Sequence, residues 1–263
     1  MSFETIKFKV ENGVGWATLN RPDKLNSINT KMLEELDSVL DKVKAEEEIR
    51  CLVLTGAGRG FCAGQDLNDR NVSSDAERPD LGKTVGEGYN PFLKRLYGLE
   101  VPTIAAVNGT AAGAGANIAL ACDIVVANEA AKFVQVYSNI GLIPDASGTF
   151  MLPRLIGMAR AKALTFTAQP VLGSEAQDMG MIWKAIPLEE LVAFVTDMAE
   201  TFAQKPTVSM AYTKKAFHVS FSNDLDAQLE VERDFMQKCG YSHDYQEGVK
   251  AFLEKRKPKF KGK

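Results

Sequence analysis

Histidine is scarce in this sequence: its 263 residues include only His218 and His243. Both lie near the C-terminus, in a segment with helical patterning. A histidine-based catalytic triad and an imidazole metal centre are therefore not expected. The four cysteines are too widely spaced to form a CxxC zinc or redox motif. They are Cys51, Cys62, Cys122 and Cys239.

Long apolar runs and excess positive charge are also missing. No stretch reaches the length of a membrane span, and residues 1–13 have neither the apolar core nor the cleavage site of a signal peptide. The net charge of −3 provides no electrostatic footprint for nucleic acid. We therefore expect a cytoplasmic globular protein without a metal, a membrane partner or a nucleic-acid partner.

The hydrophobic pattern favours an α/β fold. Residues 6–10 and 14–20 alternate around the turn signal of residues 11–13, which predicts a hairpin. Apolar residues at helical spacing predict a helix over residues 30–48, capped by Thr30. Strand, glycine-rich loop and helix then recur up to about residue 150.

Two further segments have a distinct character. The polar residues 70–90 contain several breakers, which predicts a loop with a short helix. From about residue 188 one helical pattern follows another without obvious chemistry, and the chain ends in a basic tail, residues 250–263, that we expect to be solvated.

Two loops of small residues follow predicted buried strands: "FCAGQD" (61–66) and "GTAAGAGANIAL" (109–120). The second lacks both the third glycine of a dinucleotide motif and the Lys-Ser/Thr of a phosphate loop. At a strand-to-helix turn, unpaired backbone N–H groups can hold an anion or a carbonyl oxygen that becomes anionic. Close helix packing through Gly and Ala is an equal alternative for the second loop alone. Together the two loops could direct two donors at one oxygen.

Asp145 lies in "GLIPDASGTF" (141–150), behind a proline and ahead of small residues. The local pattern by itself favours a helix N-cap, because capping acids are far commoner than catalytic ones.

Four ordered segments carry a resemblance to a known family. Residues 61–67, 105–127 and 132–149 resemble signature segments of the crotonase, or enoyl-CoA hydratase/isomerase, superfamily, and residues 19–28 resemble its CoA-contacting strand and turn. The resemblance extends over essentially the whole chain. It implies an α/β spiral of ββα units (residues 1–195), a helical C-terminal trimerisation region (residues 196–263), and a homotrimer or homohexamer. It implies no cofactor, since the CoA thioester is the substrate.

The resemblance also implies roles for individual residues. The backbone amides of Gln65 and Ala114 would hold the thioester carbonyl oxygen. The residues implied along the CoA are Lys24, Leu25, Ala63, Asp66 and Leu67, with Lys255 of the tail reaching the phosphates across a subunit boundary. Ser147 stands where many members have glycine.

The expected chemistry depends on side chains. The two glutamates with which hydratases of the family activate water fall on Asn117 and Tyr137, and neither can act as a carboxylate base. We expect both to line the acyl pocket. Isomerases of the family carry an acid where Asp145 lies. The resemblance thus favours an acyl-CoA isomerase with Asp145 as acid/base, converting the ring-1,2-epoxide of phenylacetyl-CoA to the oxepin thioester and/or 3-enoyl-CoA to 2-enoyl-CoA.

Four alternatives remain open from the sequence. The chain could be an enoyl-CoA hydratase, or a dehalogenase-like enzyme in which Asp145 is a nucleophile. It could also be an RNA-binding homologue, which the acidic excess of residues 31–48 disfavours, or a scaffold without activity.

Overall fold

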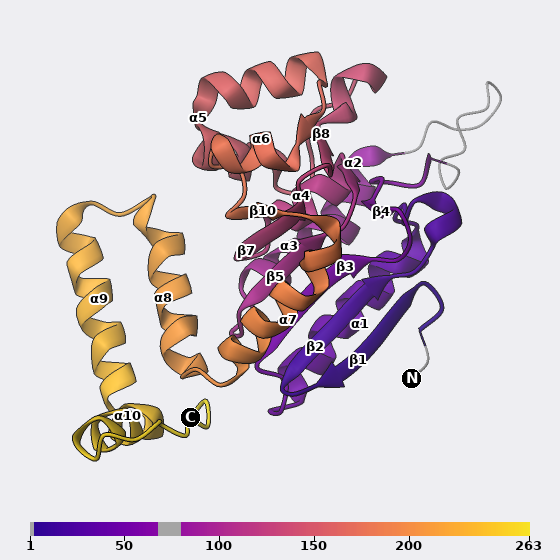
Figure 1. Cartoon of the computed structure of the whole chain (residues 1–263). Coiled ribbons are helices and arrows are strands. Elements are labelled where there is room, and N and C mark those ends of the chain that lie inside the picture. The colour runs from indigo at the N-terminus through magenta and orange to yellow at the C-terminus, as the bar shows by residue number, and fades with distance from the viewer. Residues whose placement is uncertain (1–2, 68–79) are drawn as a thin grey trace.

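The computed structural model describes residues 3–67 and 80–263 (Figure 1). In this part of the chain a larger sheet has the strand order β1-β2-β3-β5-β7-β10 and a smaller one the order β4-β6-β8-β9. The strands of the larger sheet are β1 (Ile6–Glu11), β2 (Val14–Leu19), β3 (Cys51–Gly56), β5 (Thr103–Val107), β7 (Ile124–Asn128) and β10 (Lys184–Ile186). Those of the smaller sheet are β4 (Gly60–Cys62), β6 (Thr110–Ala112), β8 (Lys132–Val134) and β9 (Val171–Leu172).

The chain repeats a ββα unit. Strands β1 and β2 form the expected antiparallel hairpin and lead into a helix. In the next units the first strand (β3, β5, β7) joins the larger sheet in parallel, and the second (β4, β6, β8) joins the smaller sheet in parallel. Because consecutive strands diverge into different sheets, the ends of β4, β6 and β8 lie side by side although they are far apart in sequence.

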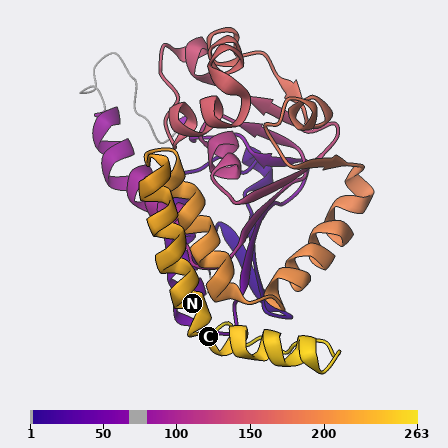
Figure 2. The same cartoon turned by 90° about the vertical axis from the view of Figure 1, so that its left-hand side faces the viewer.

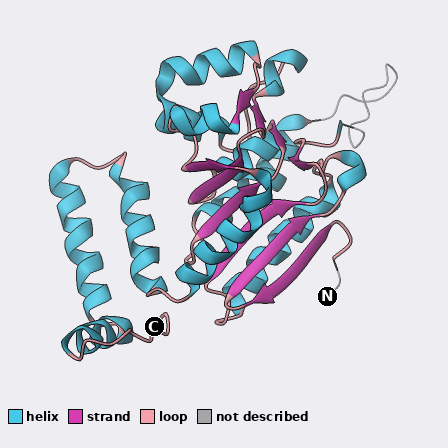
Figure 3. Cartoon of the chain, viewed as in Figure 1, coloured by secondary structure: helices cyan, strands magenta, loops and turns pink. Residues whose placement is uncertain are grey.

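Helices follow the strand pairs and cover the sheets (Figure 3). Those of the repeating units and their connections are α1 (Thr30–Ala45), α2 (Leu81–Thr84), the π-helix η3 (Val85–Tyr89), α3 (Asn90–Tyr97), α4 (Ala114–Leu120), α5 (Gly148–Thr167) and α6 (Gly173–Asp178), with 3-10 turns η1 (Pro22–Lys24) and η4 (Val136–Ile140). The C-terminal helices are α7 (Leu188–Ala203), α8 (Thr207–Ser220), α9 (Leu225–Gly240) and α10 (His243–Leu253). No helix in the described ranges has the length and apolar character needed to cross a bilayer.

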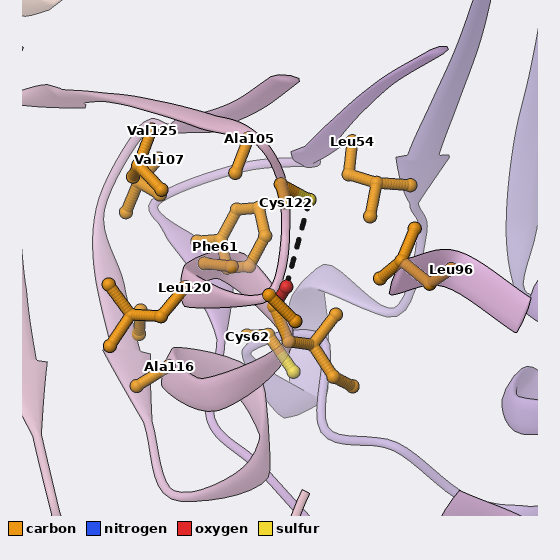
Figure 4. Close-up of a cluster of buried hydrophobic side chains, with 14 of the residues drawn as sticks. Leu54, Phe61, Cys62, Leu96, Ala105, Val107, Ala116, Leu120, Cys122 and Val125 are labelled. Atoms are coloured by element: carbon orange, nitrogen blue, oxygen red, sulfur yellow. Dashed lines mark hydrogen bonds between the residues drawn. The ribbon is translucent and has the colours of Figure 1, made fainter. Parts of the chain in front are cut away.

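The core lies between the two sheets and the helices that follow them. Figure 4 shows side chains of β3, β5 and β7 meeting those of β4 and α4 around the ring of Phe61. On the opposite face of the larger sheet a second cluster packs beneath α7. Its helix members are Leu191, Val195, Ala199 and Ala203. Burial on both faces explains why the parallel strands read as continuous apolar runs.

One local prediction is wrong, and another is confirmed in the part that the structure describes. Helix α1 is capped by Asn29, whose extended backbone lets Oδ1 accept the N–H of Met32, and Thr30 is already helical. The short helix expected within residues 70–90 is present: residues 81–90 belong to an unbroken helical run through α2, η3 and α3, in which Tyr89 is fully buried. Residues 68–79, which hold most of the predicted loop, lie outside the described residues.

Helices α8, α9 and α10 form an arm beside the sheets (Figures 1 and 2). The expected division between residues 195 and 196 falls inside α7, and α7 packs on β3, β5 and β7 along its length. Packing of the C-terminal helices on the larger sheet therefore continues to Ala203, and the arm begins after it. An oligomerisation role for residues 196–263 stays a prediction.

The lysine side chains of the basic tail are exposed, as expected, and the backbone of the tail is also bound to the fold. The buried carboxylate of Asp244 accepts the backbone N–H groups of Lys261 and Gly262, both at 2.7 Å. Arg50 donates to the carbonyl oxygens of Phe260 (3.0 Å) and Lys205 (2.6 Å). A charged acceptor thus holds the backbone of the tail while its lysine side chains remain exposed.

Asp244→Ala is expected to lower the free energy of unfolding by about 2 kcal/mol, because two N–H groups lose a charged acceptor. Urea unfolding followed by circular dichroism measures the change. Asp197→Ala, at an exposed position on α7, is the control and should leave stability within about 0.5 kcal/mol of wild type. An equal midpoint for both variants would show that the tail contributes nothing to the fold.

Candidate active site

The candidate site lies at the carboxyl ends of β4, β6 and β8, where ligands commonly bind in parallel sheets. The loops of residues 61–66 and 109–120 approach each other closely here, and glycine makes that approach possible. A Cβ on Gly64 would lie 2.8 Å from the carbonyl oxygen of Ala112, and one on Gly115 would lie 2.4 Å from that of Cys62. Gly64 also has a φ of +88°, a conformation that other residues rarely adopt. The two predicted loops are therefore in contact.

Each loop presents an amide without a hydrogen-bond acceptor among the described residues. Ile28 donates to Gly64 (2.7 Å) and accepts from Asp66 (2.8 Å), so the N–H of Gln65 between them points the other way. Ala114 is the first residue of α4, where an N–H has no partner within the helix. The loop contact brings the predicted amides of Gln65 and Ala114 to one edge of the sheet.

Most residues expected along the CoA lie beside these loops. Ala63 donates to the carbonyl of Leu25 at 3.0 Å, next to Lys24, whose side chain is exposed. Leu67 is exposed as well, whereas Asp66 is buried and its carboxylate pairs with Arg21 at 2.8 Å. The structure thus assigns the Asp66 side chain an ion pair within the protein.

Asn26 holds this turn in place and was missed from the sequence. It is fully buried in the left-handed region, and its Nδ2 donates to the carbonyls of Ala57 and Gly60, both at 2.9 Å. Asparagine tolerates that backbone conformation, which is the signal in "KLNS" that could have identified it.

Lys255 does not join the site of its own chain. It follows α10, which Figures 1 and 2 place at the far end of the molecule from β4 and α4. A contact with CoA across a subunit boundary stays a prediction.

Asp145 is held by a neighbouring hydroxyl and not by a helix end. The Tyr137 O–H donates to Asp145 Oδ1 at 2.5 Å. Helix α5 begins at Gly148 with Ser147 as its N-cap, in the left-handed region at φ 68°, where glycine would be the ordinary residue. The N-cap interpretation of Asp145 is therefore wrong, and the carboxylate of this half-buried residue is instead bonded to Tyr137 of η4.

Tyr137 remains protonated in this environment. Burial raises the pKa of its hydroxyl well above the usual range, and the negative charge of Asp145 raises it further. The hydroxyl is consequently a permanent donor to the carboxylate. Asn117, fully buried on α4, donates from Nδ2 to the Tyr137 oxygen at 3.1 Å. The structure brings Asn117, Tyr137 and Asp145 together as one hydrogen-bonded group.

Cys62 lies in the first loop but is not a nucleophile. It is fully buried, and burial raises the pKa of its thiol to about 12, so the reactive thiolate does not form near neutral pH. Its role is packing, in the cluster of Figure 4.

Tyr89 is a second residue that the sequence did not reveal. It ends the π-helix η3, and its hydroxyl donates to Gln65 Oε1 at 2.6 Å. The hydroxyl therefore fixes the side chain of the residue whose amide faces the site. A single π-turn often marks a functional position.

Tyr89→Phe is expected to lower kcat about fivefold with little change in KM, because loss of about 1 kcal/mol of hydrogen bonding loosens the Gln65 loop. Steady-state kinetics on a CoA thioester measures kcat and KM separately. Tyr241→Phe removes a hydroxyl from a side chain that is 80% exposed and should retain full activity. A wild-type kcat in Tyr89→Phe would mean that the loop does not depend on this bond.

Two unpaired amides beside an anchored carboxylate form an arrangement that is able to stabilise a carbonyl oxygen while a proton moves nearby. The sequence profile of the family described as "Enoyl-CoA hydratase/isomerase" matches residues 9–263. The chain belongs to the enoyl-CoA hydratase/isomerase family, whose members act on acyl-CoA thioesters, and the expected crotonase fold with a helical C-terminal region is confirmed.

Individual relatives span the full chain. The sequence is 49% identical over 260 residues, 99% of each protein, to the 1,2-epoxyphenylacetyl-CoA isomerase of Escherichia coli (strain K12). It is 44% identical over 263 residues, 100% of each, to a probable enoyl-CoA hydratase of Rhodobacter capsulatus. A crystal structure of enoyl-CoA hydratase from Bacillus anthracis matches with a TM-score of 0.92 at 32% identity, covering 99% of this chain and 100% of that one.

Proposed function

We propose that the protein is an acyl-CoA isomerase that converts the ring-1,2-epoxide of phenylacetyl-CoA to the oxepin thioester, shifts the double bond of 3-enoyl-CoA to the 2-position, or does both. The observation that carries the proposal is the position of Asp145, bonded to Tyr137 at 2.5 Å in the same edge of the sheet as the free amides of Gln65 and Ala114. The similarity to the Escherichia coli isomerase supports the choice of acyl group.

For the double-bond shift, the thioester oxygen accepts hydrogen bonds from the amides of Gln65 and Ala114. Asp145 takes a proton from C2, the electrons form a dienolate on the thioester, and the same carboxylate returns the proton to C4. The two amides lower the barrier because they meet the oxygen as it becomes negative. For the epoxide, Asp145 assists ring expansion by proton transfer or by its charge.

Hydration is the second candidate, favoured by the name of the Rhodobacter capsulatus relative. It requires a base for water. The hydroxyl of Tyr137 stays protonated, and the Asn117 amide donates both to Tyr137 and to the Asp145 carbonyl. Neither residue supplies a base, so the geometry favours isomerisation.

We also propose that Lys24, Leu25, Ala63, Asp66 and Leu67 line the CoA, largely through backbone groups, and that Lys255 of another subunit reaches its phosphates. A homotrimer or homohexamer would supply that subunit. Large exposed apolar side chains along the α8–α10 arm support such contacts. They include Phe217, Phe221, Leu225, Leu229, Met236 and Phe252.

Product mass and ultraviolet absorbance together test the proposed reaction, because an isomerisation changes the chromophore and leaves the mass unchanged. Wild-type protein is incubated separately with the ring-1,2-epoxide of phenylacetyl-CoA, a 3-enoyl-CoA and a 2-enoyl-CoA. We expect rearranged thioesters of unchanged mass from one or both of the first two, and no turnover of the third to a hydrated product. A product heavier by one water molecule would establish hydration and overturn the proposal.

A further inference from the structure

A buried chain of hydrogen bonds leads to Asp145 from a residue with no assigned role. Gln135 Nε2 donates to Asn117 Oδ1 at 2.9 Å, Asn117 Nδ2 donates to the Tyr137 oxygen at 3.1 Å, and Tyr137 donates to Asp145 Oδ1 at 2.5 Å. The exposed fractions of Gln135, Asn117 and Tyr137 are 4%, 0% and 5%. The chain joins the end of β8 to α4, to the turn η4 and to the loop before α5.

Two groups hold the Asn117 amide in one orientation: the Asp145 carbonyl accepts from Nδ2, and Gln135 donates to Oδ1. The carbonyl oxygen of Asp145, 2.9 Å from the Asn117 amide, can only accept, so the atom of Asn117 that faces it must be Nδ2. The other atom, Oδ1, must then accept, and Gln135 supplies the donor. Because the Tyr137 oxygen accepts from Asn117, its own proton is left for Asp145. Every link therefore has a single orientation.

A glutamine at position 135 costs stability that a purely structural residue would not cost. Its Oε1 is buried and has no hydrogen-bond partner among the described residues, which costs about 1–3 kcal/mol. An apolar side chain of similar length would avoid that cost but would leave Asn117 Oδ1 without a donor. The donor function of Nε2 is what the glutamine retains.

We propose that Gln135 is a positioning residue of the isomerase: through Asn117 it directs the Tyr137 proton to Asp145 Oδ1, so that the carboxylate presents only Oδ2 to the substrate. This inference rests on the proposed function. A carboxylate anchored through one oxygen cannot rotate between its two basic atoms. The same oxygen then takes the proton from one carbon and returns it to another on the same face of the acyl chain.

A double-mutant cycle tests the proposal. Gln135→Met keeps the length of the side chain and removes the donor, and Tyr137→Phe removes the hydroxyl through which Gln135 is proposed to act. We expect each to lower kcat on the turned-over thioester about tenfold with KM changed less than about twofold. The double variant should be no slower than Tyr137→Phe within about twofold, because the path from Gln135 is already broken.

Two results would overturn the proposal that Gln135 is a positioning residue. If the losses of the single variants multiply in the double variant, Gln135 acts independently of Tyr137. If a crystal structure of Gln135→Met keeps the Tyr137 hydroxyl on Asp145 and Asn117 Nδ2 on Tyr137, the glutamine does not direct the chain, whatever the activity. Gln169→Met, at an exposed position, controls for the substitution and should match wild type. An Asp145→Asn variant that stays active would instead refute the proposed function itself.

Discussion

Asp145→Asn is expected to lower kcat by at least about a hundredfold on whichever thioester the wild type isomerises. The amide is nearly the same size and can still contact Tyr137, but it cannot take up a proton. Binding of the thioester uses the amides of Gln65 and Ala114 and should persist, so KM is expected to change only a few-fold. Steady-state kinetics followed by absorbance measures kcat and KM, and product mass shows whether water has been added.

The control is Asp197→Asn, an exposed acid on α7 that should match wild type. Intact-protein mass during turnover separates the acid/base role from a nucleophilic one, since attack by Asp145 would add the acyl group to the chain. A full rate in Asp145→Asn would remove the residue from the mechanism. An adduct on Asp145 would support the dehalogenase-like alternative.

Gly64→Ala is expected to lower kcat about a hundredfold, comparable to the loss of one oxyanion donor. The new Cβ would lie 2.8 Å from the carbonyl oxygen of Ala112, and φ is +88° there, so the two loops must separate and the amides of Gln65 and Ala114 no longer meet at one oxygen. Kinetics and the thermal unfolding midpoint are measured together.

Gly240→Ala is the matched control, because a Cβ there meets no atom within 4 Å. It should keep both the rate and the unfolding midpoint. If Gly64→Ala unfolds normally and isomerises at the wild-type rate, the oxyanion stabilisation does not depend on the contact between these loops.

Local patterns predicted much of this molecule. The hairpin β1–β2, the buried strand β3 and the C-terminal helices follow from alternation, apolar runs and helical spacing within single segments. Patterns gave no information where a contact from a distant residue decided the outcome. The burial of Tyr89 in the helical run of residues 81–90 and the binding of the tail backbone by Asp244 had no local signal.

The candidate site shows the same division. The small-residue loops left a local signature in the sequence, whereas Asp145 became a catalytic candidate only through the family resemblance, because its local pattern favoured a helix cap. The partners of these groups left no such signature: Gln135 and Tyr89 are ordinary residues at the end of a strand and in a helical run, and nothing near them in sequence indicates their contacts.

The amino-acid sequence alone determined the α/β class, the order of strands and loops, the family resemblance and the residues able to supply an oxyanion hole and an acid. Only the tertiary structure decided that Asp145 is bonded to Tyr137 and is not a helix cap, and that Asn117 and Gln135 direct that bond. The physical reason is that hydrogen-bond direction and burial depend on atoms from β8, α4, η4 and the loop before α5 meeting at one place. The sequence of any one of these segments does not show which atoms of the others it will contact.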